Sequence, residues 1–304
     1  MFFGAPVWPC QWHPPYDDVI RRLAALGMQG VELIAWTPDI MADYYTPNTI
    51  RDLNSLIADL GMTVTSYHHP VPGLGSPDAG QRNKAIENFK RAVDIGASLG
   101  APYYAGTTPY PFNQEVPRLL TRATTQEWQV PIARDLDWTA AYDTYVEALT
   151  TCCVIAGQAN MGIVVEPHPF RWVNSAQSML RLIERTGAEN LGLNLDPSHL
   201  FPVGDIPHYT VYQLGSRIYH THLVDNDGLS NAHWRPGKGK VDWSAVLQSL
   251  QDVGYTGAIS IELEDTPGAG KRDRASTPEL DVELRKSVDY LAAIMVEEGI
   301  PTRR

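Results

Sequence analysis

The chain has 304 residues, enough for one large α/β barrel or two ordinary domains, and 43% of them are hydrophobic. Its formal charge of −11 argues against nucleic acid and anionic membranes as partners, because both bind a basic face. Three cysteines make no disulfide framework, and the chain shows neither an apolar run near ~20 residues nor a signal-peptide pattern. We therefore expect a protein of the reducing cytoplasm.

Strand and helix signals alternate along the chain. Short apolar runs bounded by turn residues predict strands, at residues 2–7, 30–36, 62–69, 100–106, 162–166, 191–196, 218–223 and 258–264. Apolar residues at helical spacing predict helices, at residues 16–26, 46–60, 81–99, 138–159, 175–185, 243–253 and 278–298, with a short apolar segment at 209–214. Thr46 and Pro47 suit a helix start, and Gly27 suits a helix end.

Residues 107–137 interrupt this rhythm. The segment is rich in proline, threonine and aromatic residues, shows little periodicity, and at about 30 residues is too long for an ordinary connection. We predict an insertion after the fourth strand that covers the active site and shapes the substrate pocket.

Eight strand–helix alternations without an interdomain linker predict a parallel α/β sheet with right-handed crossovers. Closed on itself, this sheet is a single (β/α)8 TIM barrel spanning residues 1–304, and every strand's carboxyl end then points to one mouth. A doubly wound open sheet is the alternative, but no G-x-G-x-x-G motif follows a strand to support it.

The last four predicted strands share one design, a metal-ligand side chain at or near the carboxyl end. The residues are Glu166, Asp196, His222 and Glu262, with spacings of 30, 26 and 40 residues that suit one strand-plus-helix unit per step. A buried carboxylate is costly unless it is paired or binds a metal. A surface ion pair would explain one such glutamate, but four ligand types converging on one mouth indicate a functional site.

Three carboxylates and one imidazole make an oxygen-dominated site, which favours Mn²⁺, with Mg²⁺ or Co²⁺ as alternatives, over zinc. Such an ion polarises a substrate carbonyl, and the proton on the adjacent carbon then needs a general base. Glu166 and Glu262 are expected to lie across the ion, so either carboxylate could abstract that proton. His168 and His199 are protic side chains expected at the same mouth.

These motifs resemble the xylose-isomerase-like TIM-barrel superfamily, the sugar isomerases and epimerases similar to D-tagatose 3-epimerase. The resemblance covers nearly the whole chain and rests on VVEPHP, DPSH, HTHLVDN, ISIELED and PGKGKVDW. It implies a divalent metal bound by Glu166, Asp196, His222 and Glu262, with the two glutamates also moving protons. It further implies that His199 binds substrate oxygens and that the substrate is a ketose or a related keto-sugar.

Two features depart from the epimerase pattern, and one of them points to relatives that eliminate. The ketose epimerases carry an arginine soon after the metal histidine, whereas this chain has Gly228 there and Arg235 later, as a candidate substrate contact. His168 in EPHP is more similar to inosose dehydratases and to the catalytic subunit of C-glycoside deglycosidases. The alternative is thus a lyase, with His168 as the acid for the leaving group. A homo-oligomer is expected, or a small accessory subunit if the chain is a deglycosidase.

Other side chains have weaker claims on the site. Glu32, at the end of a GVEL run, is expected to bind substrate, the alternative being a salt bridge inside the barrel. His68 is a second candidate substrate contact, although either it or His69 must face away. His220 is expected in the layer below the metal ligand. Core packing is the expected role of four aromatic residues, Trp8, Trp36, Trp138 and Tyr110.

Two further function classes remain. A DNA-repair endonuclease of the same superfamily would need a three-zinc cluster with more histidines and a basic face, and the acidic charge argues against it. A binding module without catalysis is the other, but the intact ligand set argues for an enzyme.

Overall fold

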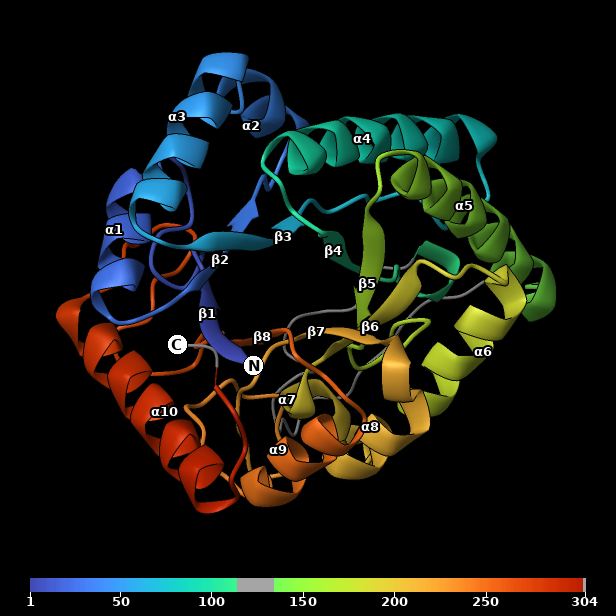
Figure 1. The fold of residues 1–304 in the computed structure, drawn as a ribbon. Helices are drawn as coiled ribbons and strands as arrows, with labels where there is room; N and C mark the ends of the chain where they lie inside the picture. Colours follow the sequence, from blue (N-terminus) through green and yellow to red (C-terminus); the bar gives the residue numbers. More distant parts are fainter. Residues whose placement is uncertain (114–133, 303–304) are drawn as a thin grey trace.

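A ring of eight parallel strands forms the centre of the computed structural model, which describes residues 1–113 and 134–302 (Figure 1). The strands are β1 (Phe2–Pro6), β2 (Gly30–Ile34), β3 (Thr63–His68), β4 (Tyr103–Thr107), β5 (Gly162–Glu166), β6 (Leu191–Leu195), β7 (Ile218–Thr221) and β8 (Ala258–Ser260). From β1 to β7, neighbours in sequence are neighbours in the sheet, and β1 also pairs with β8. The ring closes at one bridge, between His222 and Ser260.

Helices surround this ring (Figure 1). They are α1 (Asp17–Ala25), α2 (Pro38–Asp43), α3 (Pro47–Asp59), α4 (Ala79–Ser98), α5 (Trp138–Gln158), α6 (Ala176–Thr186), α7 (Pro197–Leu200), α8 (Pro207–Leu214), α9 (Trp243–Asp252) and α10 (Pro278–Glu297). Short 3-10 turns are η1 (Pro111–Asn113), η3 (Phe201–Val203) and η4 (Gly215–Arg217). No helix in the described part of the chain has the length and apolar character needed to cross a bilayer.

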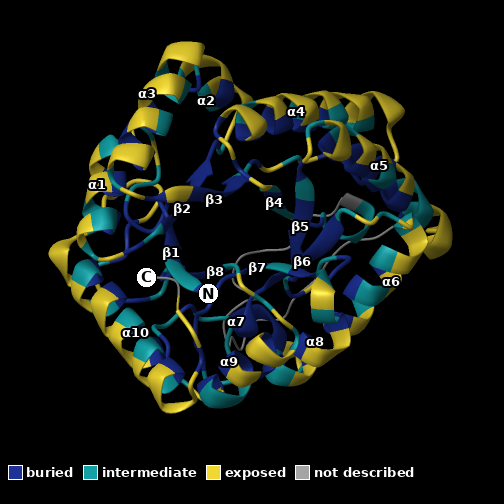
Figure 2. Ribbon diagram, viewed as in Figure 1, coloured by how far each residue is buried: buried dark blue, intermediate teal, exposed yellow. Residues whose placement is uncertain are grey.

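Burial follows the two layers. Every residue of β2 and β6 is buried, as expected for strands with the barrel interior on one side and helices on the other. The helices expose their outward faces and bury their inward faces (Figure 2). Side-chain caps define their starts; for example, Thr46 Oγ1 accepts from the backbone N–H of Thr49, and Pro47 takes the first helical position.

The predicted (β/α)8 barrel is confirmed, with differences at element ends. Helices α2 and α7 were not predicted, because each is too short to show an apolar period, although both begin with a capping residue followed by proline. The segment at 209–214 belongs to α8. Strands β7 and β8 stop before His222 and Glu262, so both side chains lie just beyond the ladder, where they are free to turn into the mouth.

The predicted insertion at 107–137 falls mostly on residues 114–133, which lie outside the described residues. Its described flanks lie near the mouth. Thr108 Oγ1 accepts from the backbone N–H of Val173, and Arg171 donates to the Thr108 carbonyl at 2.6 Å. The covering role of this segment stays a prediction.

Candidate metal centre and active-site cavity

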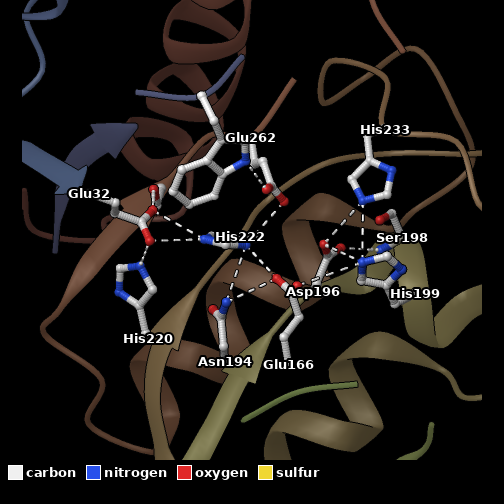
Figure 3. Close-up of polar contacts among 12 residues, drawn as sticks. Glu32, Glu166, Asn194, Asp196, Ser198, His199, His220, His222, His233 and Glu262 are labelled. Atoms are coloured by element: carbon white, nitrogen blue, oxygen red, sulfur yellow. Dashed lines mark hydrogen bonds and ion pairs between the residues drawn. The ribbon is translucent and has the colours of Figure 1, made fainter. Parts of the chain in front are cut away.

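Four side chains from consecutive strand ends converge at the carboxyl mouth of the barrel. Each of Glu166, Asp196, His222 and Glu262 offers one ligand atom, and these atoms all lie within 4.8 Å of one another. His222 Nδ1 lies 3.1 Å from Glu262 Oε2 and also contacts Glu166 Oε1, so the two glutamates flank the imidazole (Figure 3). The sequence predicted this set of four, and the fold brings it together.

His222 turns its other ring nitrogen to a buried carboxylate. Its Nε2 lies 3.1 Å from both oxygens of Glu32, on the side of the ring opposite Glu166 and Glu262 (Figure 3), and Glu32 is fully buried. A metal-binding histidine commonly donates its second N–H to a carboxylate, which fixes the ring and its tautomer. Glu32 is placed for that role, with Nδ1 left facing the other three carboxylates.

The site carries more negative charge than its neighbours balance. Burial alone would lower the pKa of His222, yet the charges of Glu32, Glu262 and Glu166 hold it well above the usual value for histidine. The ion-pair partners recorded for Glu166, Asp196 and Glu262 in the described part of the chain are all histidines. A divalent cation would supply the missing positive charge.

Asp196 supplies the sharpest test of fit for a metal. Its Oδ1 accepts from the backbone N–H of Ser198 at 2.7 Å, an N-cap contact at the start of α7. Its Oδ2 is buried and accepts no hydrogen bond from any described residue. An orphaned buried carboxylate oxygen is costly, and a cation among three carboxylates and an imidazole would satisfy it. The donor set therefore fits a hard divalent ion such as Mn²⁺, Mg²⁺ or Co²⁺.

Two hydrogen bonds hold the glutamates in place. Trp8 Nε1 donates to Glu262 Oε1 at 2.6 Å, and Asn194 Nδ2 donates to Glu166 Oε1 at 3.0 Å. Both donors point into the barrel from neighbouring strands or their ends, so the carboxylates are oriented before any ligand enters. Trp8 is buried, as the sequence predicted, but it also belongs to the site.

Three histidines form a row beside the ligand set. The ring centroids of His168 and His199 are 3.7 Å apart, and those of His199 and His233 are 4.7 Å apart. His168 Nδ1 lies 3.6 Å from Glu166 Oε2, and His199 Nε2 lies 3.6 Å from Asp196 Oδ2. Burial, with the charges of His199 and Arg171, lowers the pKa of His168 well below the ordinary value for histidine.

His233 and Asn231 were missed by the sequence reasoning. Asn231 Oδ1 lies 2.8 Å from His199 Nδ1. Asn231 and His233 lie on the loop 226–241, which the sequence analysis did not assign to the site. Asp225 organises this loop by accepting hydrogen bonds from the backbone N–H groups of 237, 239 and 241 and from Trp243 Nε1. The sequence signal that could have predicted an ordered loop here is Asp225, which precedes the glycine-rich PGKGKVDW.

A cavity of about 1250 Å³ opens above the ligand set. Among the predicted site residues it is lined by Glu166, His168, His199, His222, Glu262 and His68. Glu32 and Arg235 do not line it: Glu32 has no exposed surface, and Arg235 pairs with Glu283 at 3.0 Å, outside the mouth. Glu32 instead forms the salt bridge inside the barrel that the sequence analysis gave as the alternative. Its partners are His68 at 2.8 Å and His220 at 3.0 Å.

The chain matches one known protein family and is similar to several sugar epimerases. Residues 20–293 match the family described as xylose isomerase-like TIM barrel. A fructoselysine 3-epimerase from Shigella flexneri is 21% identical over 82% of this chain and 85% of its own length. Among solved structures, D-psicose 3-epimerase from Clostridium cellulolyticum H10 superposes with a TM-score of 0.77 at 19% identity, covering 97% of this chain and 99% of that one. A 3-keto-D-glucoside 4-epimerase from E. coli gives 0.73 at 16% identity, with coverage of 96% and 99%.

Proposed function

The chain belongs to the xylose isomerase-like TIM barrel family, and from this membership and its ligand set we propose a divalent-metal-dependent sugar isomerase or epimerase. The reaction is proton transfer at a carbon next to the keto group of a ketose or keto-sugar. The observation that carries the proposal is the convergence of four donors at one mouth, with a cavity above and with no hydrogen bond from any described residue to the buried Asp196 Oδ2. The curated and structural relatives include proteins named as 3-epimerases and a 4-epimerase.

Glu166, Asp196, His222 and Glu262 would hold the ion, with Mn²⁺ the favoured metal. When bound, the ion supplies positive charge that stabilises the negative charge developing on the substrate's carbonyl oxygen. The chain's own residues do the rest. One glutamate carboxylate takes the proton from the carbon beside the carbonyl, and the bond electrons move toward the carbonyl oxygen. The second glutamate returns a proton to the opposite face of that carbon, which inverts it.

The positions of Glu166 and Glu262 support this division. Both contact His222 Nδ1, Glu262 from above and Glu166 from below in Figure 3, and each is oriented by a hydrogen-bond donor, Asn194 for Glu166 and Trp8 for Glu262. His199 and His68 line the cavity and are the proposed contacts to substrate oxygens. Glu32 is proposed as the residue that orients His222 from below rather than as a substrate contact.

A lyase on the same chemistry is the second candidate, and His168 favours it. This histidine follows the ligand Glu166 by two residues, lines the cavity, and its buried Nδ1 has no hydrogen-bond partner among the described residues. Elimination needs a group that exchanges a proton with the leaving group, in addition to the base at the carbon. An inosose or a 3-keto glycoside would be the substrate in that case.

The test is a substrate panel assayed with the Mn²⁺-loaded protein in deuterated water. Free ketoses, inososes and 3-keto glycosides are each read by NMR for deuterium at the carbon beside the carbonyl, for isomers and for elimination products. Deuterium incorporation with an inverted product supports the epimerase, and an unsaturated or cleaved product supports the lyase. Absence of both exchange and product across the panel, with metal bound, would remove the proposal.

A further inference from the structure

An aromatic wall runs outward from the metal centre along one side of the cavity. Trp8, which donates to Glu262, has its ring centroid 6.0 Å from that of His222. The ring of Trp36 lies 6.2 Å further along, edge to face with Trp8. Trp12 then stacks on Trp36 with a centroid distance of 3.8 Å and an interplanar angle of 5°. All three line the cavity.

The stacked pair is fixed before any ligand arrives. Trp36 Nε1 donates to the carbonyl oxygen of Trp12 at 2.9 Å, and Tyr16 Oη donates to the same oxygen at 3.3 Å. Both indoles are half-buried, unlike Trp8, so part of each ring remains accessible. Both rings pack against the edge of the hydrophobic core, as the sequence predicted for Trp36, and both also line the cavity.

The wall lies on the side of the barrel away from His168. Trp8 and Trp12 follow β1 and Trp36 follows β2, whereas His168 follows β5, which lies across the eight-stranded ring from β1. A substrate held at Glu166 and Glu262 thus has His168 on one side and the indoles on the other. The cavity volume of about 1250 Å³ exceeds the roughly 300–1,000 Å³ usual for small-molecule sites, so there is room beyond one sugar ring.

We propose that Trp12 and Trp36 form a second subsite that binds a ring linked to the reacting sugar. The substrate class would then be a keto-glycoside, carrying an aromatic or a sugar ring as its substituent, rather than a free ketose. Flat indole faces bind both kinds of ring, because each offers either a π face or a face of C–H groups. This inference rests on the proposed function for the position of the reacting sugar.

The experiment measures binding first, so that it does not depend on turnover. Methyl β-D-glucoside, phenyl β-D-glucoside and cellobiose, which carry no keto group, are titrated into the Mn²⁺-loaded protein by calorimetry. We expect a ring-bearing ligand to bind about tenfold more tightly than the methyl glucoside, as stacking on an aromatic pair allows. Preference for the phenyl ligand identifies an aromatic substituent, and preference for cellobiose identifies a second sugar; either supports the subsite.

Variants test whether the preference for ring-bearing ligands depends on Trp12 and its stacking with Trp36. Trp12→Ala should bring the ratio of affinities close to one, whereas Trp12→Phe, which keeps a ring, should retain most of the preference. Trp138→Ala is the matched control, because it removes an indole that is 51% exposed and does not line the cavity. Thermal unfolding of each variant checks that the fold is kept, and Trp12→Phe remains informative if Trp12→Ala fails to fold.

Three results would overturn the subsite: no measurable binding, equal binding of all three ligands by the unmodified protein, or a preference that survives Trp12→Ala. The turnover panel then separates this inference from the proposed function. Ring preference without proton exchange on any keto-sugar would leave the subsite standing and reject the isomerase. Proton exchange on free ketoses and keto-glycosides at equal kcat/KM would support the isomerase and reject the subsite.

Discussion

Two acidic clusters share His222, and they differ in how completely the protein satisfies them. Below the ring, on the Nε2 side, Glu32 accepts from Ser66 at 2.6 Å and His68 at 2.8 Å, contacts Ser260, and lies near His220 and His222. We call this set the floor. On the Nδ1 side lie Glu166, Asp196 and Glu262, which with His222 we call the mouth.

The carboxylate of the floor has hydrogen-bond partners on both oxygens, whereas the mouth has a carboxylate oxygen that has none among the described residues. Hydroxyl and imidazole groups surround the single carboxylate of the floor, and the charges of His222 and His220 outweigh burial and keep the pKa of Glu32 well below its usual value. The mouth has three carboxylates and an Asp196 oxygen that accepts no hydrogen bond from the described residues, its nearest histidine nitrogens being 3.6 Å away. Both clusters contain enough carboxylate and imidazole groups to bind a metal. Among the described residues, only the mouth has a carboxylate oxygen that accepts no hydrogen bond and is therefore available to a cation. A buried carboxylate oxygen without a hydrogen bond, more than the presence of acidic residues, therefore distinguishes the cluster that can bind a metal.

The largest expected effect comes from removing a carboxylate of the mouth. Glu262→Gln replaces a charged ligand by a neutral amide, and metal affinity should fall by at least about 100-fold, with turnover lost in parallel. Elemental analysis and calorimetry measure the loss. Glu264→Gln is the matched control, since Glu264 lines the same cavity outside the four donors and its change should leave the metal bound. A Glu262→Gln protein with full metal and full turnover would refute the ligand set.

His168→Ala tests what the mouth does once substrate is bound. For a lyase, product should fall by about 10²–10⁴-fold, the usual contribution of a positioned acid or base; for an epimerase, turnover should only weaken. Deuterium exchange at the carbon beside the carbonyl separates the roles. Exchange kept while product is lost assigns His168 to the leaving group, and exchange and product both unaffected make it structural. His208→Ala, outside the cavity lining, is the control.

Glu32→Gln tests whether the floor acts through the mouth. Losing the buried charge leaves its histidine partners uncompensated, so the free energy of unfolding should drop by about 3 kcal/mol. Metal affinity should fall by about 10–100-fold, as when the group behind a metal-binding histidine is lost. Chemical denaturation and metal titration measure the two effects. A drop in stability with unchanged metal affinity would make the floor a structural element only.

Trp8→Phe carries the smallest expected effect. The ring remains but the N–H that orients Glu262 is gone, so metal affinity should fall by up to about tenfold. Titration with Mn²⁺ measures the change, and thermal unfolding shows whether packing is kept. If affinity stays the same, Glu262 is held in place without the indole, and the mouth is less preorganised than its hydrogen bonds indicate.

Much of the fold could be predicted because its signals are local. Strands buried on both sides read as unbroken apolar runs, as in GIVVE and LGLNL, and proline or glycine ends them within a residue or two. Eight repeats of one unit then leave few topologies open. The four donors of the mouth share this origin, because each directly follows or ends an apolar run, and parallel strands bring such positions to one edge whatever the helices do.

Tertiary structure alone decided which neighbouring groups belong to the site. Glu32 lies within an apolar run, at the middle of β2, whereas Glu166 is the last residue of β5, and Glu32 is surrounded by histidines inside the barrel. Arg235 pairs with α10 through Glu283. His233 and Asn231 reach the site on a loop held by Asp225, and Trp12 meets Trp36 from 24 residues away. The sequence by itself determined the barrel and the four strand-end donors, since both depend on short-range pattern and strand direction. Depth within the barrel, side-chain direction and loop path depend on contacts between distant segments, and no local pattern encodes them.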